Sequence, residues 1–225
     1  VFVAICVLGL VPMLTAQEDL WPPTNLEAEV FQQVNVDLSW MPPQDPNATE
    51  IAYDDGVLGN AFYFYAPYEN GFAHGSRFDM TGDFSLVAAT VKILSEGDQY
   101  WPWPDGTHGP VRVLIFDDNG GSPGNLIHDE EAVAQDGWAT IYPNLSNLTE
   151  TFYIVASHTE DWSTGGDPEG FGVDVGVDYG DKMYTLQEGA WSTGDILGYG
   201  GDYMIRAVVN TTGGALVLDY FSSTP

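Results

Sequence analysis

Turn-forming clusters of Gly, Asp and Asn divide residues 50–209 into short pieces, and this spacing limits the fold more than any other feature. The pieces are rich in β-branched and aromatic residues, and none carries about ten residues of helical periodicity with capping residues. The sequence therefore predicts an all-β fold, a jelly-roll-like β-sandwich, with a meander or barrel as the alternative. The turn clusters are Asp55-Gly56, Thr81-Gly82-Asp83, Asn119-Gly120-Gly121, Asp136-Gly137 and Gly165-Gly166.

Between these turns lie the segments that we expect to form strands. Most alternate apolar with polar residues, as strands with one wet face do, and a few are continuously apolar. The expected strands are residues 51–54, 61–65, 76–80, 84–94, 111–116, 126–133, 138–142, 152–158, 171–177, 183–186 and 203–209.

The chain opens with an uninterrupted apolar run over residues 1–14, followed by Leu14-Thr15-Ala16 and then polar residues. This pattern predicts a secretory signal peptide, residues 1–16, cut after Ala16; a buried strand or helix is the alternative. The protein is then secreted or held at a cell surface, with no membrane span once the signal is removed. Cys6 lies within the run, so the mature chain has no cysteine for disulfides.

Residues 17–49 contain two alternating segments, 26–30 and 34–40, which predict a hairpin with one wet face. Their pattern, P-x-N-L-x-A-x-V followed by V-x-L-x-W-x-P-P, resembles the first two strands of a fibronectin type III domain. A two-stranded hairpin is marginal alone, so its apolar side chains need a partner surface. We therefore expect residues 210–225 to be a C-terminal strand or linker, and the other fibronectin strands to lie beyond Pro225.

Residues 50–209 resemble the jelly-roll modules of large secreted proteins of Bacteroidetes type, including the cleaved-adhesin (haemagglutinin) regions of gingipains. In such proteins these modules sit beside fibronectin type III strands, which implies a cell-surface adhesion module inside a longer chain. The resemblance is carried by Tyr53-Asp54-Asp55-Gly56, the strand from Val111 to Asp118, Ser122-Pro123-Gly124, Gly137-Trp138, the strand from Phe152 to Ala156, Trp191, and the segment from Asp202 to Ala207.

The charge of the chain limits the classes of partner that it can bind. The chain has 33 acidic and 5 basic residues, and its formal net charge is −28. This excludes nucleic acid as a partner, since phosphate backbones require clustered Lys and Arg. Carboxylates in tight Asp/Asn/Gly loops suit hard cations, so calcium is the predicted cofactor. The same loops form turns without any metal, which is the alternative. The candidate ligands are Asp54, Asp55, Asp117, Asp118, Asn119, Asp161 and Asp167.

An aromatic loop offers a second kind of site. Tyr100, Trp101 and Trp103 stand in a Pro-bearing segment between two expected strands, where they could form a platform for a sugar ring. The alternative is that they fold back and cap one end of the sandwich. Tyr63, Tyr65 and Tyr68 form a similar, weaker cluster.

Motifs for catalysis are missing from the sequence. It contains no H-E-x-x-H, no G-x-S-x-G and no phosphate-binding loop, and Asp174 and Asp178 read as a solvated strand face. The sequence thus predicts a non-enzymatic secreted or cell-surface β-sandwich module that binds carbohydrate or a host or cell-surface protein. It would be calcium-stabilised and linked to further domains of a longer chain. The alternatives are a purely structural spacer and a jelly-roll enzyme similar to glycoside hydrolases.

Overall fold

The computed structural model describes residues 24–31, 35–41, 48–94, 109–135, 137–148, 150–163, 170–176, 181–193 and 201–211. The chain divides into two compact units, residues 1–46 and residues 47–225, which are treated separately. In the first unit, β1 (Thr24–Phe31) pairs antiparallel with β2 (Asn35–Met41), and the two form a sheet of their own. The predicted N-terminal hairpin is therefore confirmed.

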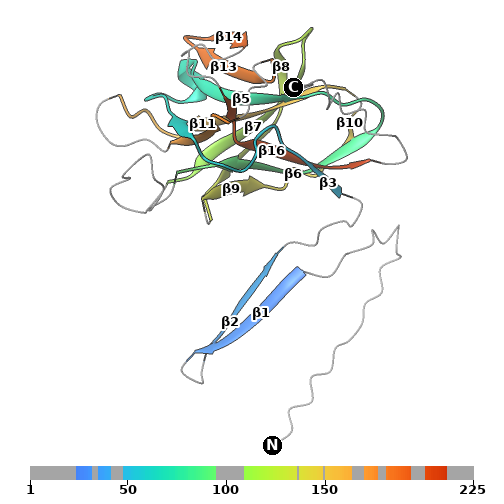
Figure 1. Ribbon diagram of the computed structural model, residues 1–225, viewed down its shortest axis with the longest axis vertical. Helices are drawn as coiled ribbons and strands as arrows, with labels where there is room; N and C mark the ends of the chain where they lie inside the picture. Colours follow the sequence, from blue (N-terminus) through green and yellow to red (C-terminus); the bar gives the residue numbers. More distant parts are fainter. Residues whose placement is uncertain are drawn as a thin grey trace, which may run out of the picture. The chain divides into compact units, whose positions relative to one another are not determined.

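The second unit is an antiparallel β-sandwich, as predicted (Figure 1). One sheet has six strands in the order β14-β13-β5-β11-β7-β8, and the other has the order β10-β6-β16-β3 with β9 also paired to β6. A smaller sheet has the order β15-β12-β4. The strands are β3 (Ala48–Ile51), β4 (Asn60–Phe62), β5 (Ala73–Phe78), β6 (Phe84–Lys92), β7 (Val111–Asp118), β8 (Pro123–Ala132), β9 (Trp138–Ile141), β10 (Leu145–Leu148), β11 (Phe152–His158), β12 (Phe171–Asp174), β13 (Met183–Gln187), β14 (Ala190–Thr193), β15 (Asp202–Tyr203) and β16 (Ile205–Thr211).

The centre of the six-stranded sheet is β11, which is buried on both faces along its whole length. Phe152, Ile154 and Ala156 point into the main core between the sheets. The ring of Phe152 stacks on Phe78 of β5 with centroids 5.2 Å apart and lies 5.5 Å from Phe84 of β6, so aromatic contacts join the two sheets.

The opposite face of the six-stranded sheet carries a second apolar cluster. Tyr153 and Val155 of β11 belong to it, together with Ala73, Leu114, Phe116, Tyr184 and Leu186. Tyr68 of the short 3-10 helix η1 (Tyr68–Asn70) and Trp191 of β14 pack over it while staying partly exposed. A sheet face that would otherwise meet water is thus covered by η1 and by a side chain from the edge strand β14.

One edge of this sheet is the long strand β8, which pairs with β7. Most of its residues are exposed, and the register with β7 is broken by two irregularities. Three successive acidic residues, Asp129, Glu130 and Glu131, follow along the strand. Bulges and charges of this kind keep an open edge from pairing with another chain.

The strands β10 and β14 were not predicted, β15 and β16 were predicted as one strand over residues 203–209, and other strands lie a few residues away from their predicted bounds. The prediction that Asp174 lies on a solvated strand face is wrong, because Asp174 is 0% exposed. The physical reason is a loop that folds over β12, in which the Asp55 N–H donates to Asp174 Oδ2 at 2.6 Å. Within the described part of the chain, no helix is long and apolar enough to cross a membrane.

Candidate functional site

Two loops meet at the end of the sandwich where β5 begins and β11 ends. Residues 63–72 connect β4 to β5, and residues 159–163 follow β11. The backbone N–H of Trp162 donates to the Tyr65 carbonyl oxygen at 2.6 Å, and the side-chain amide of Asn70 donates to Asp161 Oδ2 at 3.1 Å. We call these two segments the loop face, and their mutual hydrogen bonds hold them as one surface.

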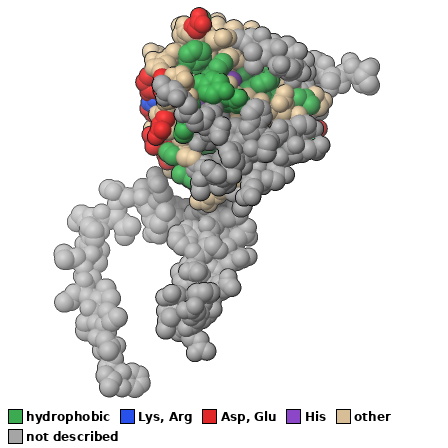
Figure 2. Space-filling view, turned by 90° about the vertical axis from the view of Figure 1, so that its left-hand side faces the viewer, with side chains coloured by type: hydrophobic (Ala, Val, Ile, Leu, Met, Phe, Trp, Pro, Cys, Tyr) green, Lys and Arg blue, Asp and Glu red, His purple; other side chains and the backbone are tan. Residues whose placement is uncertain are grey.

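The loop face carries aromatic side chains that are partly exposed to solvent. The ring of Tyr65 is half exposed, at 50%, and Tyr63 meets it edge to face with centroids 5.2 Å apart. The two hydroxyl groups lie 3.3 Å apart. Trp162 of the second loop is partly exposed, although its indole Nε1 is buried. Figure 2 shows one side of the molecule on which hydrophobic side chains gather, with acidic side chains along the margin.

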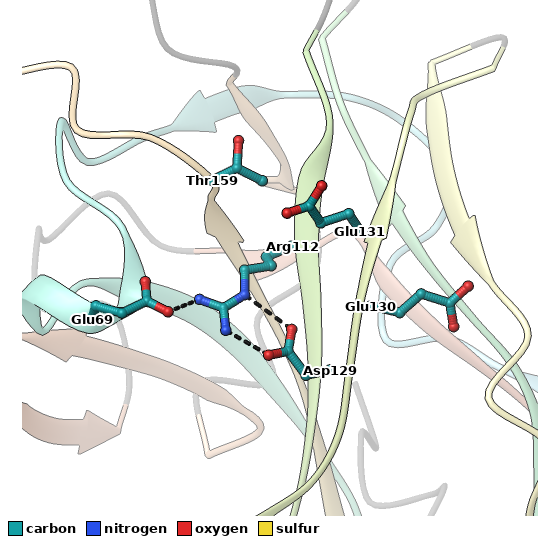
Figure 3. Close-up of a pocket in the computed structure, with 6 residues that line it drawn as sticks. All are labelled: Glu69, Arg112, Asp129, Glu130, Glu131 and Thr159. Atoms are coloured by element: carbon teal, nitrogen blue, oxygen red, sulfur yellow. Dashed lines mark hydrogen bonds and ion pairs between the residues drawn. The ribbon is translucent and has the colours of Figure 1, made fainter.

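A polar pocket of about 480 Å³ opens beside the loop face (Figure 3). Two of its lining residues belong to the loop face itself, namely Glu69 from η1 and Thr159. The others come from β7 and β8, so the pocket joins the loops to the edge of the six-stranded sheet. They are Arg112, Asp129, Glu130 and Glu131.

The charge in this pocket is held in a fixed arrangement around Arg112. The guanidinium donates to both oxygens of Asp129, with Nε 2.9 Å from Oδ1, and also to Glu69. The hydrogen bond to Asp129 is the strongest influence and raises the pKa of Arg112 above its usual value, against the opposing effect of burial. Figure 3 shows Glu130 pointing away from this group. The pocket therefore offers carboxylate oxygens, which accept hydrogen bonds, while its one cation is already paired.

Beneath the aromatic rings lies a buried histidine that sequence reasoning did not single out. His74 of β5 is 1% exposed, and Phe64 of the loop face stacks on it with centroids 4.5 Å apart and planes 5° apart. His74 Nδ1 lies 2.6 Å from the Tyr203 hydroxyl, which lies 2.9 Å from Thr185 Oγ1. Burial, and then the nearby His158, lower the pKa of His74 to about 3. His74 is therefore neutral at ordinary pH.

The predicted cation loop at Asp117, Asp118 and Asn119 forms the turn between β7 and β8. Asp117 accepts hydrogen bonds from the backbone and side-chain N–H groups of Asn125, at 2.5 and 2.9 Å. Asp118 accepts from the Gly121 N–H and from the Tyr153 hydroxyl, the latter at 2.6 Å. The Asn119 N–H donates to the Ser122 carbonyl at 2.8 Å. These bonds fix the turn, and a metal role for its three residues stays a prediction.

The second predicted loop is also engaged by neighbouring groups. Asp54 accepts two hydrogen bonds from Arg206 of β16, at 2.5 and 3.1 Å, and its side chain is 0% exposed. The hydrogen bond to Asp54 is the leading cause that raises the pKa of Arg206. Asp55 Oδ1 accepts from the Val57 N–H at 2.8 Å. The structure thus brings Asp55 to Asp174 and ties Asp54 to the other end of the chain.

The remaining predicted site residues lie either in the loop face or outside the residues that the structure describes. Asp161 lies in the loop face, where it accepts from the Ser163 N–H at 2.9 Å as well as from Asn70. Asp167, Tyr100, Trp101 and Trp103 lie outside the described residues. Tyr68 leaves the predicted tyrosine cluster and packs on Phe116, with centroids 5.6 Å apart. Over the described ranges, no three His, Cys, Asp or Glu side chains form a group that could hold a metal ion.

Comparison with known proteins relates most of the chain to part of a peptidase. Over 170 residues, 72% of this chain, the sequence is 29% identical to Bacillopeptidase F of Bacillus subtilis (strain 168). The same stretch is 11% of the length of Bacillopeptidase F, so the chain spans about a tenth of that protein. No protein family matches the chain, and no solved structure matches it.

Proposed function

We propose that this chain is a non-enzymatic, carbohydrate-binding β-sandwich module of a longer secreted or cell-surface protein. The observation that carries the proposal is the loop face, which bears the half-exposed ring of Tyr65 and also contributes Glu69 and Thr159 to a pocket lined with carboxylates. The apolar face of a pyranose ring stacks on aromatic rings, and carboxylate oxygens accept hydrogen bonds from sugar hydroxyls.

Charge favours neutral or amine-bearing glycans over anionic ones. Four carboxylates and one arginine line the pocket, and Asp129 and Glu69 already pair with that arginine. The formal charge of the whole chain is −28, so sulfated or uronic-acid polymers are repelled at moderate ionic strength.

The place of the module in a longer protein is supported by the extent of the match. Most of this chain aligns with a small part of Bacillopeptidase F, which is the relation expected for an accessory segment of a larger polypeptide. The ion pairs around Arg112 also favour a binding role over acid–base catalysis. The two carboxylates that contact the arginine, Asp129 and Glu69, are both already held in ion pairs.

The test is binding to neutral polysaccharides, measured by depletion onto insoluble glycans and by affinity electrophoresis. We expect Tyr65→Ala and Trp162→Ala to weaken binding at least tenfold, because each removes a ring on which the sugar stacks. Tyr142→Ala is the matched control, since Tyr142 is 44% exposed, close to the 50% of Tyr65. Tyr142 directly follows β9, which belongs to the other sheet of the sandwich. Both tyrosine variants should lower the free energy of unfolding by under about 1 kcal/mol.

Two results would contradict the proposal. Equal loss of binding in Tyr65→Ala and Tyr142→Ala would show that the loop face is not the site. Absence of binding to every glycan, together with capture of the wild-type protein by a defined protein ligand, would move the function to protein adhesion.

A further inference from the structure

The aromatic surface of the loop face is anchored on His74. Phe64 covers the imidazole on one side, and the chain from His74 Nδ1 through the Tyr203 hydroxyl to Thr185 joins β5, β15 and β13. Phe171 of β12 lies 5.6 Å from the imidazole centroid. The segment 63–72 therefore closes over a histidine that is only 1% exposed.

We propose that acidification opens the loop face, because residues 63–72 must leave the sandwich for His74 to take up a proton. The effect on ligand binding rests on the proposed function, whereas the opening itself does not. Opening would remove Phe64 from the imidazole and carry Tyr63 and Tyr65 away from Trp162.

The surroundings of His74 oppose a charge. Its Nε2 is buried without a hydrogen-bond partner among the described residues, so a proton there would add an unsatisfied positive group to the core. The titratable groups that face it are His158 from β11 and Tyr203 from β15, and neither supplies a negative charge at neutral pH. Phe171 of β12, Thr185 of β13 and Phe64 of the loop face do not titrate.

The size of the effect follows from proton linkage. A histidine that is exposed by opening titrates near its ordinary pKa of ~6.5, whereas burial lowers the pKa of His74 to about 3 in the closed state. The open state then binds one more proton between these values, and acid favours it. From pH 7.5 to pH 5.0 the population of the open state should rise about 30-fold. Most carboxylates, with ordinary pKa values near ~4, contribute little over this window.

The experiment follows the amides of the loop face by NMR hydrogen exchange, corrected for the intrinsic rate at each pH. The Trp162 and Gly71 amides are the reporters, since each donates within or between the two loops. We expect their protection to fall about 30-fold from pH 7.5 to pH 5.0 in the wild type. His74→Asn should remove this dependence, because an amide group can still pair with the Tyr203 hydroxyl but does not titrate.

His128→Asn is the matched control, because His128 of β8 lies at the surface beside Glu130 and should leave the profile unchanged. Loss of the pH dependence in His158→Asn but not in His74→Asn would overturn the assignment. If His74→Asn does not fold, the wild-type imidazole signal decides. No titration of His74 above about pH 5 is expected, and a midpoint near ~6.5 in the folded protein would refute the proposal.

Binding to neutral polysaccharide is measured in parallel at the two pH values. Weaker binding at pH 5.0 in the wild type, but not in His74→Asn, is the expected result. Acid opening without glycan binding at either pH would leave the switch standing and reject the carbohydrate site. Glycan binding that is equal at both pH values, with unchanged exchange, would reject the switch alone.

Discussion

The β7–β8 turn and the loop face both contain the residue types from which a ligand site is inferred, yet they differ in what their side chains still offer. In the turn, the oxygens of Asp117 and Asp118 accept hydrogen bonds from Asn125, Gly121 and Tyr153. In the loop face, hydrogen bonds join the two loops, and the ring of Tyr65 is half exposed. An acidic turn is thus explained by its own geometry, whereas exposed aromatic rings are not explained by packing.

The largest expected effect is on the free energy of unfolding when one glycine is replaced in the loop face and, for comparison, one in an ordinary turn. Gly71 has φ 86°, and a Cβ there would collide with the backbone of Gly189. Gly82 has φ 82°, but a Cβ there would meet nothing within 4 Å. We expect Gly71→Ala to lower the free energy of unfolding by about 3 kcal/mol and Gly82→Ala by about 1 kcal/mol, measured by urea denaturation. Equal losses would show that the loop face is not pressed against the β13–β14 turn.

The next test is whether the acidic turns bind calcium. Calcium binding there would remove the difference drawn above, because the turn carboxylates would then hold a ligand as well as form the turn. If the predicted cation loops bind calcium only in the folded state, saturation at 100 Kd stabilises the protein by about 2.7 kcal/mol. Adding a chelator at constant ionic strength should then lower Tm by several degrees. Asp117→Asn should remove the response if the β7–β8 turn is the site. An unchanged melting curve in the wild type would leave these carboxylates with a purely structural role.

A smaller effect is expected where the turn is tied to the sheet. Tyr153→Phe removes a hydroxyl that donates to Asp118, and we expect a loss of about 2 kcal/mol in the free energy of unfolding. Tyr184→Phe is the comparison, since its hydroxyl donates at 2.7 Å to the uncharged Gly121 carbonyl, and about 1 kcal/mol is expected. A larger loss in Tyr184→Phe would contradict the structural role given to Asp118.

Turn-forming residues made most strands of the sandwich predictable from the sequence. The two strands that were not predicted, β10 and β14, were missed for local reasons. The strand β14 was missed because its hairpin turns at Glu188-Gly189, where both residues have positive φ, 52° and 79°. Asn-Gly or Asp-Gly is the usual signal for such a turn, and glutamate gives no such signal. The strand β10 was missed because Leu145–Leu148 is a short segment preceded by Asn144 at φ 47° and interrupted by Asn147 at φ 60°.

The candidate site was less predictable, because tertiary contacts create it. The sequence grouped Tyr63, Tyr65 and Tyr68 by proximity along the chain, but the structure keeps the first two together and sends Tyr68 to Phe116. The hydrogen bond between His74 and Tyr203 spans 129 positions, and no periodicity in the sequence reports such a pair. The backbone N–H of Trp162 reaches the Tyr65 carbonyl across 97 positions along the chain. The tendency to expose aromatic rings was visible in the sequence, but their partners were not.

The shape and charge of β8 have a consequence for how this protein behaves when it is concentrated. An edge of ten residues is long enough to template pairing with a second chain, but Asp129, Glu130 and Glu131 would face like charges on any neighbouring copy. An irregular acidic edge of this kind disfavours strand pairing between copies at high concentration, so we expect the strand that lines the pocket also to limit aggregation.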